Sequence, residues 1–559
     1  MQNDLEKSLL HRLMDIRNID KSKYDDFLNP SFANSWLDPQ NLNDINKWVD
    51  RILIAISKNQ KIMIFGDYDV DGVTSSRVVY KFFRKFCNYH NISIRLPNRL
   101  QDGYGIKKYH LDEIKSLGVE LVITVDNGIT AYEEIEHAKN IWLDVVITDH
   151  HQKLDKIPDA IAVINPQISP NYEFKWICGA GVAFKVCYEL AIKLKFTKEK
   201  IREFVEYMLP VVAIWTVSDC VPLIWENRLM VQRWLSLLNA RKWVSQSILS
   251  FMDYLNLGKS RPIGSMEIWY IIWPRLNAWW RILSPVESLN ILIYKWEKQL
   301  YHIKKIDELN NHRKKLQDNM IKFADENIDL DQNILIAGGD WFHEWVVGIV
   351  SGRLTEKYHK PSMVYSIDKE KWIAVASLRS PSYFSIVDML YAHHHILLRY
   401  GGHKQAWWLT VELYKLPQLI NDLNTYCKKN LVDADLTKYI YIDTILQIND
   451  LTKESLKIID MLEPYGEWNR EPLFLLRQVK ISEIKVVGKK WNGHIKFCIK
   501  INDKILSAMY RSKWWFFSDY IDYLDSLTDV VVKVKIDNFD SNGFYLIVQE
   551  IWRDISVTQ

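Results

Sequence analysis

Acidic and histidine side chains gather at four points of this sequence, each at the end of a short apolar run. The runs are KIMIFGDYDVDG, ELVITVDNG, LDVVITDHH and LPVVAIWTVSD, and the residues that end them are Asp67, Asp69, Asp71, Asp126, Asp149, His150, His151 and Asp219. Carboxylates crowded into one dry site raise one another's pKa and destabilise the fold unless divalent cations neutralise them. Oxygen ligands together with imidazole suit Mn²⁺, with Mg²⁺ as the alternative ion. Two such ions about 3.5–4 Å apart would stabilise attack at phosphorus, so the residues predict a metal-dependent phosphoesterase centre.

Each of these motifs has a simpler interpretation when it is taken alone. The pattern DxDxDG is often a calcium-binding loop, and a single aspartate after a strand is commonly a helix N-cap. An EF-hand is disfavoured because DYDVDGVTSSRV ends in Val78, where that loop requires glutamate. Four motifs in order, each ending a predicted strand, favour a shared catalytic site over four unrelated features.

A parallel sheet is the element that we expect to position these residues. From residue 49 onward, short apolar runs alternate with helix-like segments, which predicts an α/β fold with helices on both faces of the sheet. Ligands of an open parallel sheet bind outside the carboxyl ends of its strands. If all four runs are strands, their acidic ends should therefore meet in one crevice.

The rest of the chain divides into further predicted segments. No Gly or Pro occurs between Val286 and Ala337, which favours long helical structure that bridges two lobes. A second α/β domain should begin at QNILIAGGD, and short alternating strands near the C-terminus predict a small β-barrel. The expected boundaries are a lead-in at 1–48, a catalytic domain at 49–235, a helical connector at 236–331, the second α/β domain at 332–415, a helical linker at 416–472 and the barrel at 473–552.

Length, charge and cysteine usage limit the class of protein. The chain has 559 residues, too many for one core, and its net charge of +3 means that any nucleic-acid site must be a local groove. The six cysteines form no CxxC pair, which argues against a zinc ribbon and fits a reducing compartment. The start, MQNDLEKSLLHRL, is too charged for a signal peptide, and no apolar run is long enough to span a bilayer. We therefore expect a cytoplasmic protein without a membrane partner.

Four stretches of this chain, GDYDVDG, VDNGI, VITDHH and TVSDCVPL, resemble the four motifs of the DHH phosphoesterases. Further stretches follow the order seen in the RecJ-type members of that family, over roughly residues 25–550: RLPNRLQDGYGI, CGAGVAFK, ENRLM, PRLNA, VVGIVSGRL, LRS and GGHKQA. The resemblance implies a Mn²⁺-dependent 5′→3′ exonuclease that releases 5′-mononucleotides from single-stranded DNA in repair and recombination.

The resemblance also implies roles for individual residues. The metal ligands would be Asp69, Asp71, Asp126, His150 and Asp219, and the supporting catalytic groups beside His150 would be Asp67, Asp149 and His151. The second α/β domain is similar to a DHHA1 domain, in which the phosphates would be held by Arg379, Ser380 and His403 with the backbone of Gly401 and Gly402. An arginine fork and glycine-flanked N–H groups both suit phosphate. Further substrate contacts would come from Arg275, Asn277 and Arg281.

The C-terminal domain resembles an OB-fold, which would track a strand through basic and aromatic side chains. Its candidates are Lys485, Lys489, Lys490, Lys496 and Lys500. The expected partner is single-stranded DNA, joined by a single-strand-binding protein or a helicase, and the expected state is a monomer. Two alternatives stay open: a DHH phosphodiesterase acting on short oligonucleotides or cyclic dinucleotides, and a non-catalytic single-strand-binding scaffold.

Tryptophan stands at ten positions where the family pattern has glycine. They are Trp142, Trp215, Trp225, Trp234, Trp243, Trp273, Trp280, Trp345, Trp408 and Trp468, and further candidates are Trp279, Trp372, Trp407 and Trp491. The chain has 23 Trp and only 20 Gly, whereas the usual glycine content of about 7% would give roughly twice as many.

Ten tryptophans in glycine sites should be incompatible with a stable fold. Overpacking costs about 1–3 kcal/mol at each site, against a total stability of about 5–15 kcal/mol. The tryptophans could be stacking platforms for bases, or genuine residues with compensating changes, or UGA codons written as Trp where the source organism inserts Gly. We favour the third interpretation, because one systematic exchange explains both the tryptophan excess and the glycine deficit.

Overall fold

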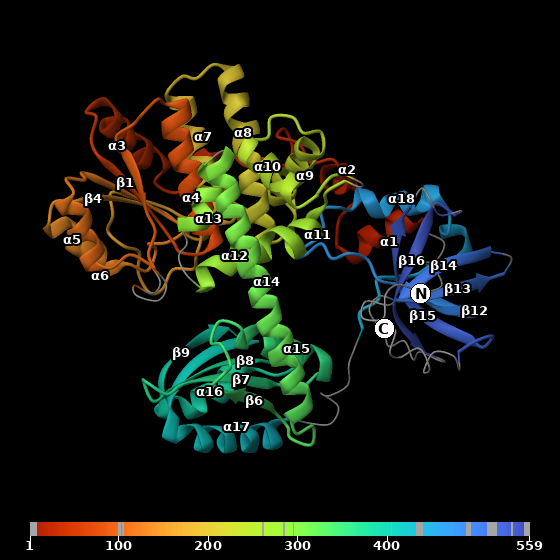
Figure 1. Ribbon diagram of the computed structural model, residues 1–559. Coiled ribbons are helices and arrows are strands. Elements are labelled where there is room, and N and C mark those ends of the chain that lie inside the picture. The colour runs from red at the N-terminus through yellow and green to blue at the C-terminus, as the bar shows by residue number, and fades with distance from the viewer. Residues whose placement is uncertain are drawn as a thin grey trace. The chain divides into compact units, whose positions relative to one another are not determined.

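The chain forms two compact units (Figure 1). The first comprises Met1–Pro274, Pro285–Leu300 and Tyr441–Gln559, and the second comprises Arg275–Ser284 and Tyr301–Ile440. The structure is a computed structural model that describes residues 8–98, 102, 105–259, 262–282, 286–294, 296–403, 405–431, 440–487, 494–502, 504–510, 523–537, 540 and 542–552. Among these residues, no helix is both long and apolar enough to cross a membrane.

A five-stranded parallel sheet lies at the centre of the first unit. Its strand order is β2-β1-β3-β4-β5, and each neighbouring pair runs parallel. The strands are β1 (Ile62–Gly66), β2 (Ile92–Arg95), β3 (Leu121–Val125), β4 (Asp144–Thr148) and β5 (Ala162–Ile164). Every residue of β1 and β3 is buried, as expected for a sheet with helices on both faces. The predicted α/β fold is confirmed.

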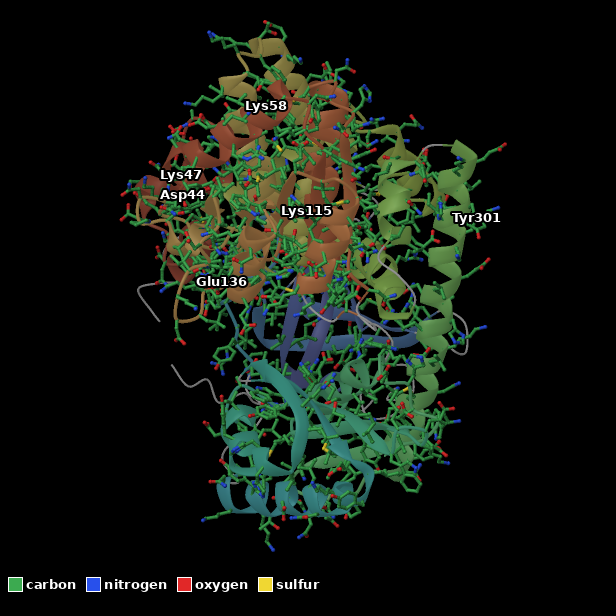
Figure 2. All side chains as sticks on the ribbon, turned by 90° about the vertical axis from the view of Figure 1, so that its left-hand side faces the viewer. Asp44, Lys47, Lys58, Lys115, Glu136 and Tyr301 are labelled. Atoms are coloured by element: carbon green, nitrogen blue, oxygen red, sulfur yellow. The ribbon has the colours of Figure 1, made fainter. Side chains whose placement is uncertain are left out.

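Helices cover both faces of this sheet. On one face, α5 (Lys108–Ser116) and α6 (Tyr132–Asn140) bury apolar residues such as Leu111 and Ile135 against Phe65 of β1. On the other face lie α3 (Ile45–Ser57), α4 (Val70–Lys81) and α7 (Gly179–Lys193). Figure 2 shows the charged Lys47 and Glu136 on the outside of this domain, and both are exposed. The helices are therefore amphipathic in the way that the sequence pattern predicts.

The fourth predicted strand is wrong, because LPVVAIWTVSD belongs to helix α8 (Lys198–Ser218). The helix begins at Thr197, whose side chain caps the N–H of Lys200, and it continues through Pro210. Every residue from Met208 to Ser218 is buried, so the segment is apolar on all sides. Periodicity cannot distinguish such a buried helix from a buried strand. Asp219 therefore follows the C-terminus of a helix.

The remaining helices of the first unit surround α8 or lead toward the barrel. They are α1 (Leu9–Ile16), α2 (Tyr24–Leu28), α9 (Trp225–Asn239), α10 (Gln246–Tyr254), α11 (Ser265–Glu267), α13 (Val286–Ile293) and α18 (Lys453–Met461). Two more helices cross from the first unit into the second, namely α12 (Trp273–Ile282) and the 32-residue α14 (Trp296–Asn327). The long helical structure expected after Val286 is thus present.

The C-terminal strands close into a barrel, as the sequence predicts. The closed ring is β12-β13-β14-β16-β15, because β12 also pairs with β15. The short strand β11 (Thr444–Ile445) joins β12 in parallel. The ring strands are β12 (Phe474–Val487), β13 (His494–Ile501), β14 (Lys504–Tyr510), β15 (Leu527–Ile536) and β16 (Phe544–Trp552).

The N-terminal segment contributes to the core of this barrel. Leu9, Leu13 and Met14 of α1 belong to the same buried cluster as Phe474 and other barrel residues. Arg12 forms an ion pair of 2.5 Å with Asp450. The described part of the expected lead-in at 1–48 therefore packs with residues more than 400 positions away. The predicted domain boundaries themselves stay a prediction.

The second unit is built on a mixed five-stranded sheet of order β6-β7-β8-β10-β9. Only β6 and β7 pair in parallel. One face packs on α14 and α15 (Val347–Tyr358), and the other on α16 (Ile386–His393) and α17 (Leu416–Asn430). The strands are β6 (Leu335–Gly339), β7 (Ser362–Asp368), β8 (Ile373–Arg379), β9 (Leu397–His403) and β10 (Ala406–Glu412).

Five tryptophans have a backbone conformation that favours glycine. Their φ angles lie between +46° and +62°, and the residues are Trp142, Trp225, Trp243, Trp372 and Trp468. This left-handed region costs an ordinary L-residue about 1–2 kcal/mol, whereas glycine enters it freely. The backbone therefore supports the prediction that glycine belongs at these positions.

Buried tryptophans supply a second observation. The indole Nε1 atoms of Trp215, Trp234 and Trp407 are buried and have no hydrogen-bond partner among the described residues. A buried indole N–H normally finds an acceptor, and that of Trp48 donates to Thr148 Oγ1 at 3.2 Å. The glycine interpretation stays a prediction, and Trp491 and the side chains of Trp279 and Trp280 lie outside the described residues.

Candidate metal centre

The loop after β1 brings the first three aspartates to the edge of the sheet. Asp69 is the N-cap of α4, and its Oδ1 accepts the N–H groups of Asp71 (2.9 Å) and Gly72 (3.0 Å). Gly72 lies so close to the loop that a Cβ there would come 2.4 Å from the nitrogen of Asp67. Asp69 therefore caps a helix, as an aspartate after a strand commonly does. The same loop also brings the three carboxylates close together.

Asp126 follows β3 in an unusual conformation. Its φ is +62°, a region that aspartate tolerates better than most residues, and its N–H donates to Thr148 O at 2.9 Å. The next residue, Asn127, fixes the turn by donating to Phe65 O and Val125 O. The side chain of Asp126 is buried, and neither of its carboxylate oxygens accepts a hydrogen bond from a described residue.

In the sequence DHH after β4, the carboxylate of Asp149 supports the two histidines that follow it. Asp149 is fully buried and accepts the N–H of Ile129 (2.9 Å), the N–H of His150 (2.7 Å) and Nδ1 of His151 (2.8 Å). Burial would raise the pKa of Asp149, but the hydrogen bond and charge of His151 lower it to about 2. Asp149 is thus an ionised anchor for the two histidines.

The two histidines carry different charges. Burial, together with the neighbouring His151, lowers the pKa of His150 to about 3. Burial also acts to lower the pKa of His151, but its hydrogen bond to Asp149 raises it to about 9. A neutral imidazole can donate a lone pair to a metal, so His150 is the histidine that is ready to act as a ligand.

His150 is surrounded by carboxylates from three different segments. Its Nε2 lies 3.1 Å from Asp126 Oδ1, 3.6 Å from Asp71 Oδ2 and 3.8 Å from Asp219 Oδ2. Asp219 reaches this place from the C-terminus of α8 and not from a strand. The crevice that we predicted at the ends of four strands is thus formed by three strand ends and one helix end.

Helix α7 holds one of these carboxylates with its first turn. The N–H groups of Gly179 and Ala180 donate to the two oxygens of Asp71 at 2.6 and 2.9 Å, where the helix N-terminus favours negative charge. A Cβ on Gly179 would come 2.6 Å from Asp126 Oδ1. The motif CGAGVAFK, which the sequence singled out only through its resemblance to RecJ-type proteins, therefore contributes to the centre.

The whole set has the properties of a cation site. Three overlapping groups have ligand atoms within 4.8 Å of one another: Asp126, His150 and His151; Asp71, His150 and Asp219; and Asp67, Asp69 and Asp126. Burial, then the charge of Asp69, raises the pKa of Asp71 to about 7. Burial and neighbouring carboxylates also raise the pKa of Asp67, Asp126 and Asp219 well above the usual range. Buried acids with free oxygens fit divalent cations held by oxygen and imidazole.

Comparisons with known proteins agree with this geometry. A family model described as the DHH family, N-terminal domain, matches residues 61–211, and one described as the RecJ OB domain matches residues 442–547. The single-stranded-DNA-specific exonuclease RecJ of Bacillus subtilis is 32% identical over 468 residues, which cover 83% of this chain and 58% of that protein. The protein of the same name from Haemophilus influenzae is 28% identical, covering 88% of this chain and 87% of its own length. The chain thus contains a DHH-family domain and a RecJ-type OB domain, and over most of its length it is similar to RecJ proteins.

Solved structures of RecJ proteins share the fold. RecJ from Thermus thermophilus in complex with Mn²⁺ superposes with a TM-score of 0.80 at 21% identity, covering all of this chain and 78% of that one. The complex of the same protein with Mg²⁺ gives a TM-score of 0.74. The likeness at this identity establishes the fold. The chain spans 58% of the length of the Bacillus subtilis relative, so activity and substrate are argued separately below.

The phosphate-binding residues that the RecJ resemblance implies lie in the second unit. Arg379 ends β8, and its guanidinium donates to Ser377 Oγ at 3.0 Å and to Leu378 O at 2.8 Å. Ser380 donates its hydroxyl to Phe384 O at 2.7 Å. Gly348, in the first turn of α15, lies beside the same arginine, since a Cβ there would come 3.3 Å from Nη2 of Arg379. Arg379, Ser380 and the start of α15 thus adjoin one another.

The two glycines whose backbone we expect to help hold phosphate lie in a strand and not in a loop. Gly401 and Gly402 belong to β9, the edge strand, and pair with Trp408 and Trp407 of β10. A Cβ on Gly402 would come 2.2 Å from Ala406 O, so close pairing of the two strands requires glycine here. The pair GG therefore marked a tight strand pairing that sequence alone does not distinguish from a turn.

The other implied substrate contacts are only partly described. Arg275 lies on α12, and its Nε donates to Asp307 of α14 at 2.7 Å. Asn277 lies on the same helix. The side chains of Arg281 and His403 lie outside the described residues, as do Lys489 and Lys490 of the barrel.

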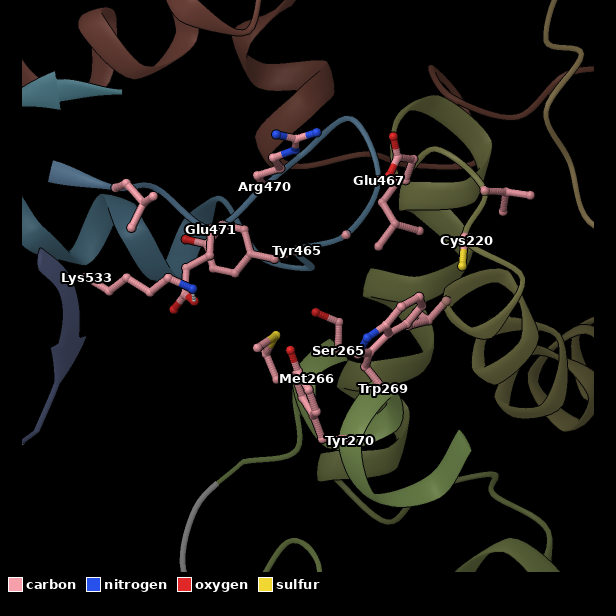
Figure 3. Close-up of a pocket in the computed structure, with 15 residues that line it drawn as sticks. Cys220, Ser265, Met266, Trp269, Tyr270, Tyr465, Glu467, Arg470, Glu471 and Lys533 are labelled. Atoms are coloured by element: carbon pink, nitrogen blue, oxygen red, sulfur yellow. Dashed lines mark hydrogen bonds and ion pairs between the residues drawn. The ribbon is translucent and has the colours of Figure 1, made fainter. Parts of the chain in front are cut away.

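A pocket lies within the first unit (Figure 3). It has a volume of 440 Å³, and its wall includes Val217, Cys220 and Leu223, which flank Asp219 in the sequence. Trp269, Tyr270 and Tyr465 bring aromatic rings to it. Sequence reasoning missed this pocket because four segments far apart in the chain build it.

Proposed function

We propose that this chain is a divalent-metal-dependent exonuclease that degrades single-stranded DNA from the 5′ end to 5′-mononucleotides in repair and recombination. The observation that carries the proposal is the convergence of Asp71, Asp126, Asp219 and His150 on one point, where neither carboxylate oxygen of Asp126 accepts a hydrogen bond from a described residue. The RecJ relatives supply the substrate class by their names.

In this proposal the ligands are Asp69, Asp71, Asp126, His150 and Asp219, and the preferred ion is Mn²⁺, with two ions in the site. When bound, such ions supply Lewis acidity and a nucleophile at neutral pH. The chain's own contribution is to keep His150 neutral, to hold it through Asp149, and to fix Asp71 on the start of α7. His151, charged and hydrogen-bonded to Asp149, adds a positive charge next to the carboxylates.

Arg379 and Ser380 are proposed to hold the substrate phosphates, together with His403, Gly401 and Gly402. An arginine offers two parallel N–H donors to a phosphate. The guanidinium of Arg379 is fixed by Ser377 Oγ and a backbone carbonyl, so it loses little freedom on binding. Arg275, Asn277 and Arg281 are proposed as further contacts.

The barrel supports binding of a single strand. Lys485 lies opposite Lys496, and Lys480 lies opposite Lys500, on the paired strands β12 and β13. Like charges placed opposite one another destabilise a sheet, and a phosphate backbone would neutralise them. A single-strand-binding protein or helicase partner, the monomeric state and the cytoplasmic location stay predictions.

The test is hydrolysis of a long single strand labelled at either end, with Mn²⁺, Mg²⁺ or no metal. We expect metal-dependent release of mononucleotides from the 5′ end, and little cleavage of a blunt duplex. Faster turnover of dinucleotides or cyclic dinucleotides than of the long strand would favour the small-substrate phosphodiesterase instead. Strand binding without any hydrolysis would favour the non-catalytic scaffold.

A further inference from the structure

Three consecutive polar residues fill the first turn of α9, and all three are buried. Glu226, Asn227 and Arg228, here named the α9 polar turn, have exposed fractions of 0%, 0% and 1%. Burying three polar side chains in a row is unfavourable unless each finds hydrogen-bond partners. Each of the three side chains has at least one hydrogen-bond partner, in a different part of the first unit, although Oδ1 of Asn227 accepts no hydrogen bond from a described residue. The partners indicate what each residue positions.

Glu226 and Arg228 contact other elements of the first unit through hydrogen bonds and an ion pair. Glu226 accepts the hydroxyl of Tyr172 at 2.6 Å and pairs with Lys185 of α7 at 2.5 Å. Arg228 donates to the carbonyls of Phe27, Met461, Leu462 and Glu463 at 2.5 to 3.1 Å. Arg228 thus joins the end of α18 to the N-terminal segment. Neither segment carries an aspartate or histidine of the metal centre.

Asn227 contacts two segments that border the metal centre, one before α7 and one after Asp219. Its Nδ2 donates to Trp176 O at 2.6 Å and to Pro222 O at 3.0 Å. Trp176 lies three residues before Gly179, whose N–H holds Asp71. Pro222 lies three residues after Asp219. One amide group therefore ties the segment before α7 to the segment after Asp219.

The geometry points to Asn227 as a positioning residue of the metal centre. We propose that its two N–H bonds fix the separation of Asp71 and Asp219, the two carboxylates that lie on opposite segments beside His150. This inference rests on the metal-binding part of the proposed function. Groups that orient metal ligands without touching the ion typically contribute about 10- to 100-fold to metal affinity.

The experiment is a titration of the metal-free full chain with Mn²⁺, in which free Mn²⁺ is measured by electron paramagnetic resonance. We expect Asn227→Ala to weaken Mn²⁺ binding about 10- to 100-fold. Asn227→Ser, which keeps one hydroxyl donor, should lie between Asn227→Ala and the unaltered chain. The matched control is Gln232→Ala on the same helix. The side-chain amide of Gln232 likewise donates to a backbone carbonyl, Leu28 O at 3.0 Å. Leu28 does not border any aspartate of the metal centre, so the Mn²⁺ affinity should stay within about twofold.

Thermal unfolding of the metal-free variants separates positioning from general stability. Arg228→Lys should lower the unfolding temperature but leave the Mn²⁺ affinity unchanged, because its carbonyl partners lie away from the centre. Equal loss of affinity in Arg228→Lys and Asn227→Ala would overturn the proposal, as would unchanged affinity in a folded Asn227→Ala. If Asn227→Ala does not fold, the affinity of Asn227→Ser decides in the same way.

Nuclease assays on the same samples keep this inference distinct from the proposed function. Weakened Mn²⁺ binding by the Asn227 variants, in a chain that cleaves no DNA, would retain the positioning role and overturn the exonuclease. Unchanged Mn²⁺ binding in an active exonuclease would overturn the positioning role alone. A chain that binds no Mn²⁺ in any form would overturn both.

Discussion

The metal centre and the tryptophan positions share two unfavourable features, namely a positive φ at a residue other than glycine and a buried polar atom without a hydrogen bond. In the centre, Asp126 combines a φ of +62° with two buried carboxylate oxygens that accept no hydrogen bond from a described residue. Elsewhere, tryptophans such as Trp142 have a positive φ, and buried ones such as Trp215 have an indole N–H without a described acceptor. In the centre both features fall on one residue beside His150 and Asp71, where a cation would satisfy the two carboxylate oxygens. The tryptophans are scattered over both units and share no ligand.

This difference shows how a broken rule can be interpreted. Strain that is concentrated at one site, next to groups with a common chemistry, is typical of function. Strain that recurs at one residue type, regardless of place, points to the identity of that residue. Asp126 is therefore explained by what it binds, and the tryptophans by the glycine that we predict in their place.

The largest expected effect is the loss of activity in Asp126→Ala. Removing this carboxylate should reduce Mn²⁺-dependent release of mononucleotides by more than the about 10- to 100-fold typical of groups that only support a ligand. The control is Asp155→Ala, which changes an exposed aspartate of the same domain and should leave the rate unchanged. Activity of Asp126→Ala near that of the unaltered chain would remove Asp126 from the centre.

Asp126→Gly sharpens the same comparison. Glycine accepts the positive φ, so this variant relieves the backbone and removes a buried carboxylate. We expect the metal-free variant to unfold at a higher temperature than the unaltered chain while its nuclease activity is lost. A lower unfolding temperature would mean that the carboxylate stabilises the metal-free fold, contrary to its raised pKa.

The second effect is the gain in stability expected when all ten tryptophans at predicted glycine positions are replaced together. A chain carrying Gly at Trp142, Trp215, Trp225, Trp234, Trp243, Trp273, Trp280, Trp345, Trp408 and Trp468 should be several kcal/mol more stable, at about 1–3 kcal/mol for each relieved site. Chemical unfolding of both chains measures this, with soluble yield as a second readout. The natural protein offers an independent check, since peptide sequencing that finds tryptophan at these positions would refute the glycine interpretation.

What the sequence could and could not predict follows from the range of the interactions. Asp67, Asp126 and His150 were predictable because each follows a strand within a short motif, so local pattern and parallel-sheet geometry suffice. The helical state of LPVVAIWTVSD was not, because a fully buried helix has no polar face. The role of Asn227 was not predictable, because its partners Trp176 and Pro222 are brought together only when the chain folds.

The third effect should have opposite signs at two buried tryptophans. Trp48 fits its site, donates to Thr148 and is fully buried, so Trp48→Gly should cost about 3–5 kcal/mol, the usual loss for a large buried aromatic residue. Trp215 is equally buried but has no described acceptor. Trp215→Gly should leave stability unchanged or increase it, as denaturant midpoints of both variants will measure. A loss at Trp215 as large as that at Trp48 would contradict the glycine interpretation.

The smallest effect is the clearest test of backbone strain alone. Trp142 is 87% exposed with a φ of +55°, so Trp142→Gly removes almost no packing. Relief of about 1–2 kcal/mol from the left-handed conformation, less about 0.5–1 kcal/mol for the freedom of glycine in the unfolded chain, leaves a net gain near 0.5–1 kcal/mol. Trp341 is also exposed, at 45%, but it packs on Phe342 and is not among the residues with positive φ. Trp341→Gly should therefore lower the denaturant midpoint where Trp142→Gly raises it, and equal signs would show that exposure, and not backbone conformation, governs the response.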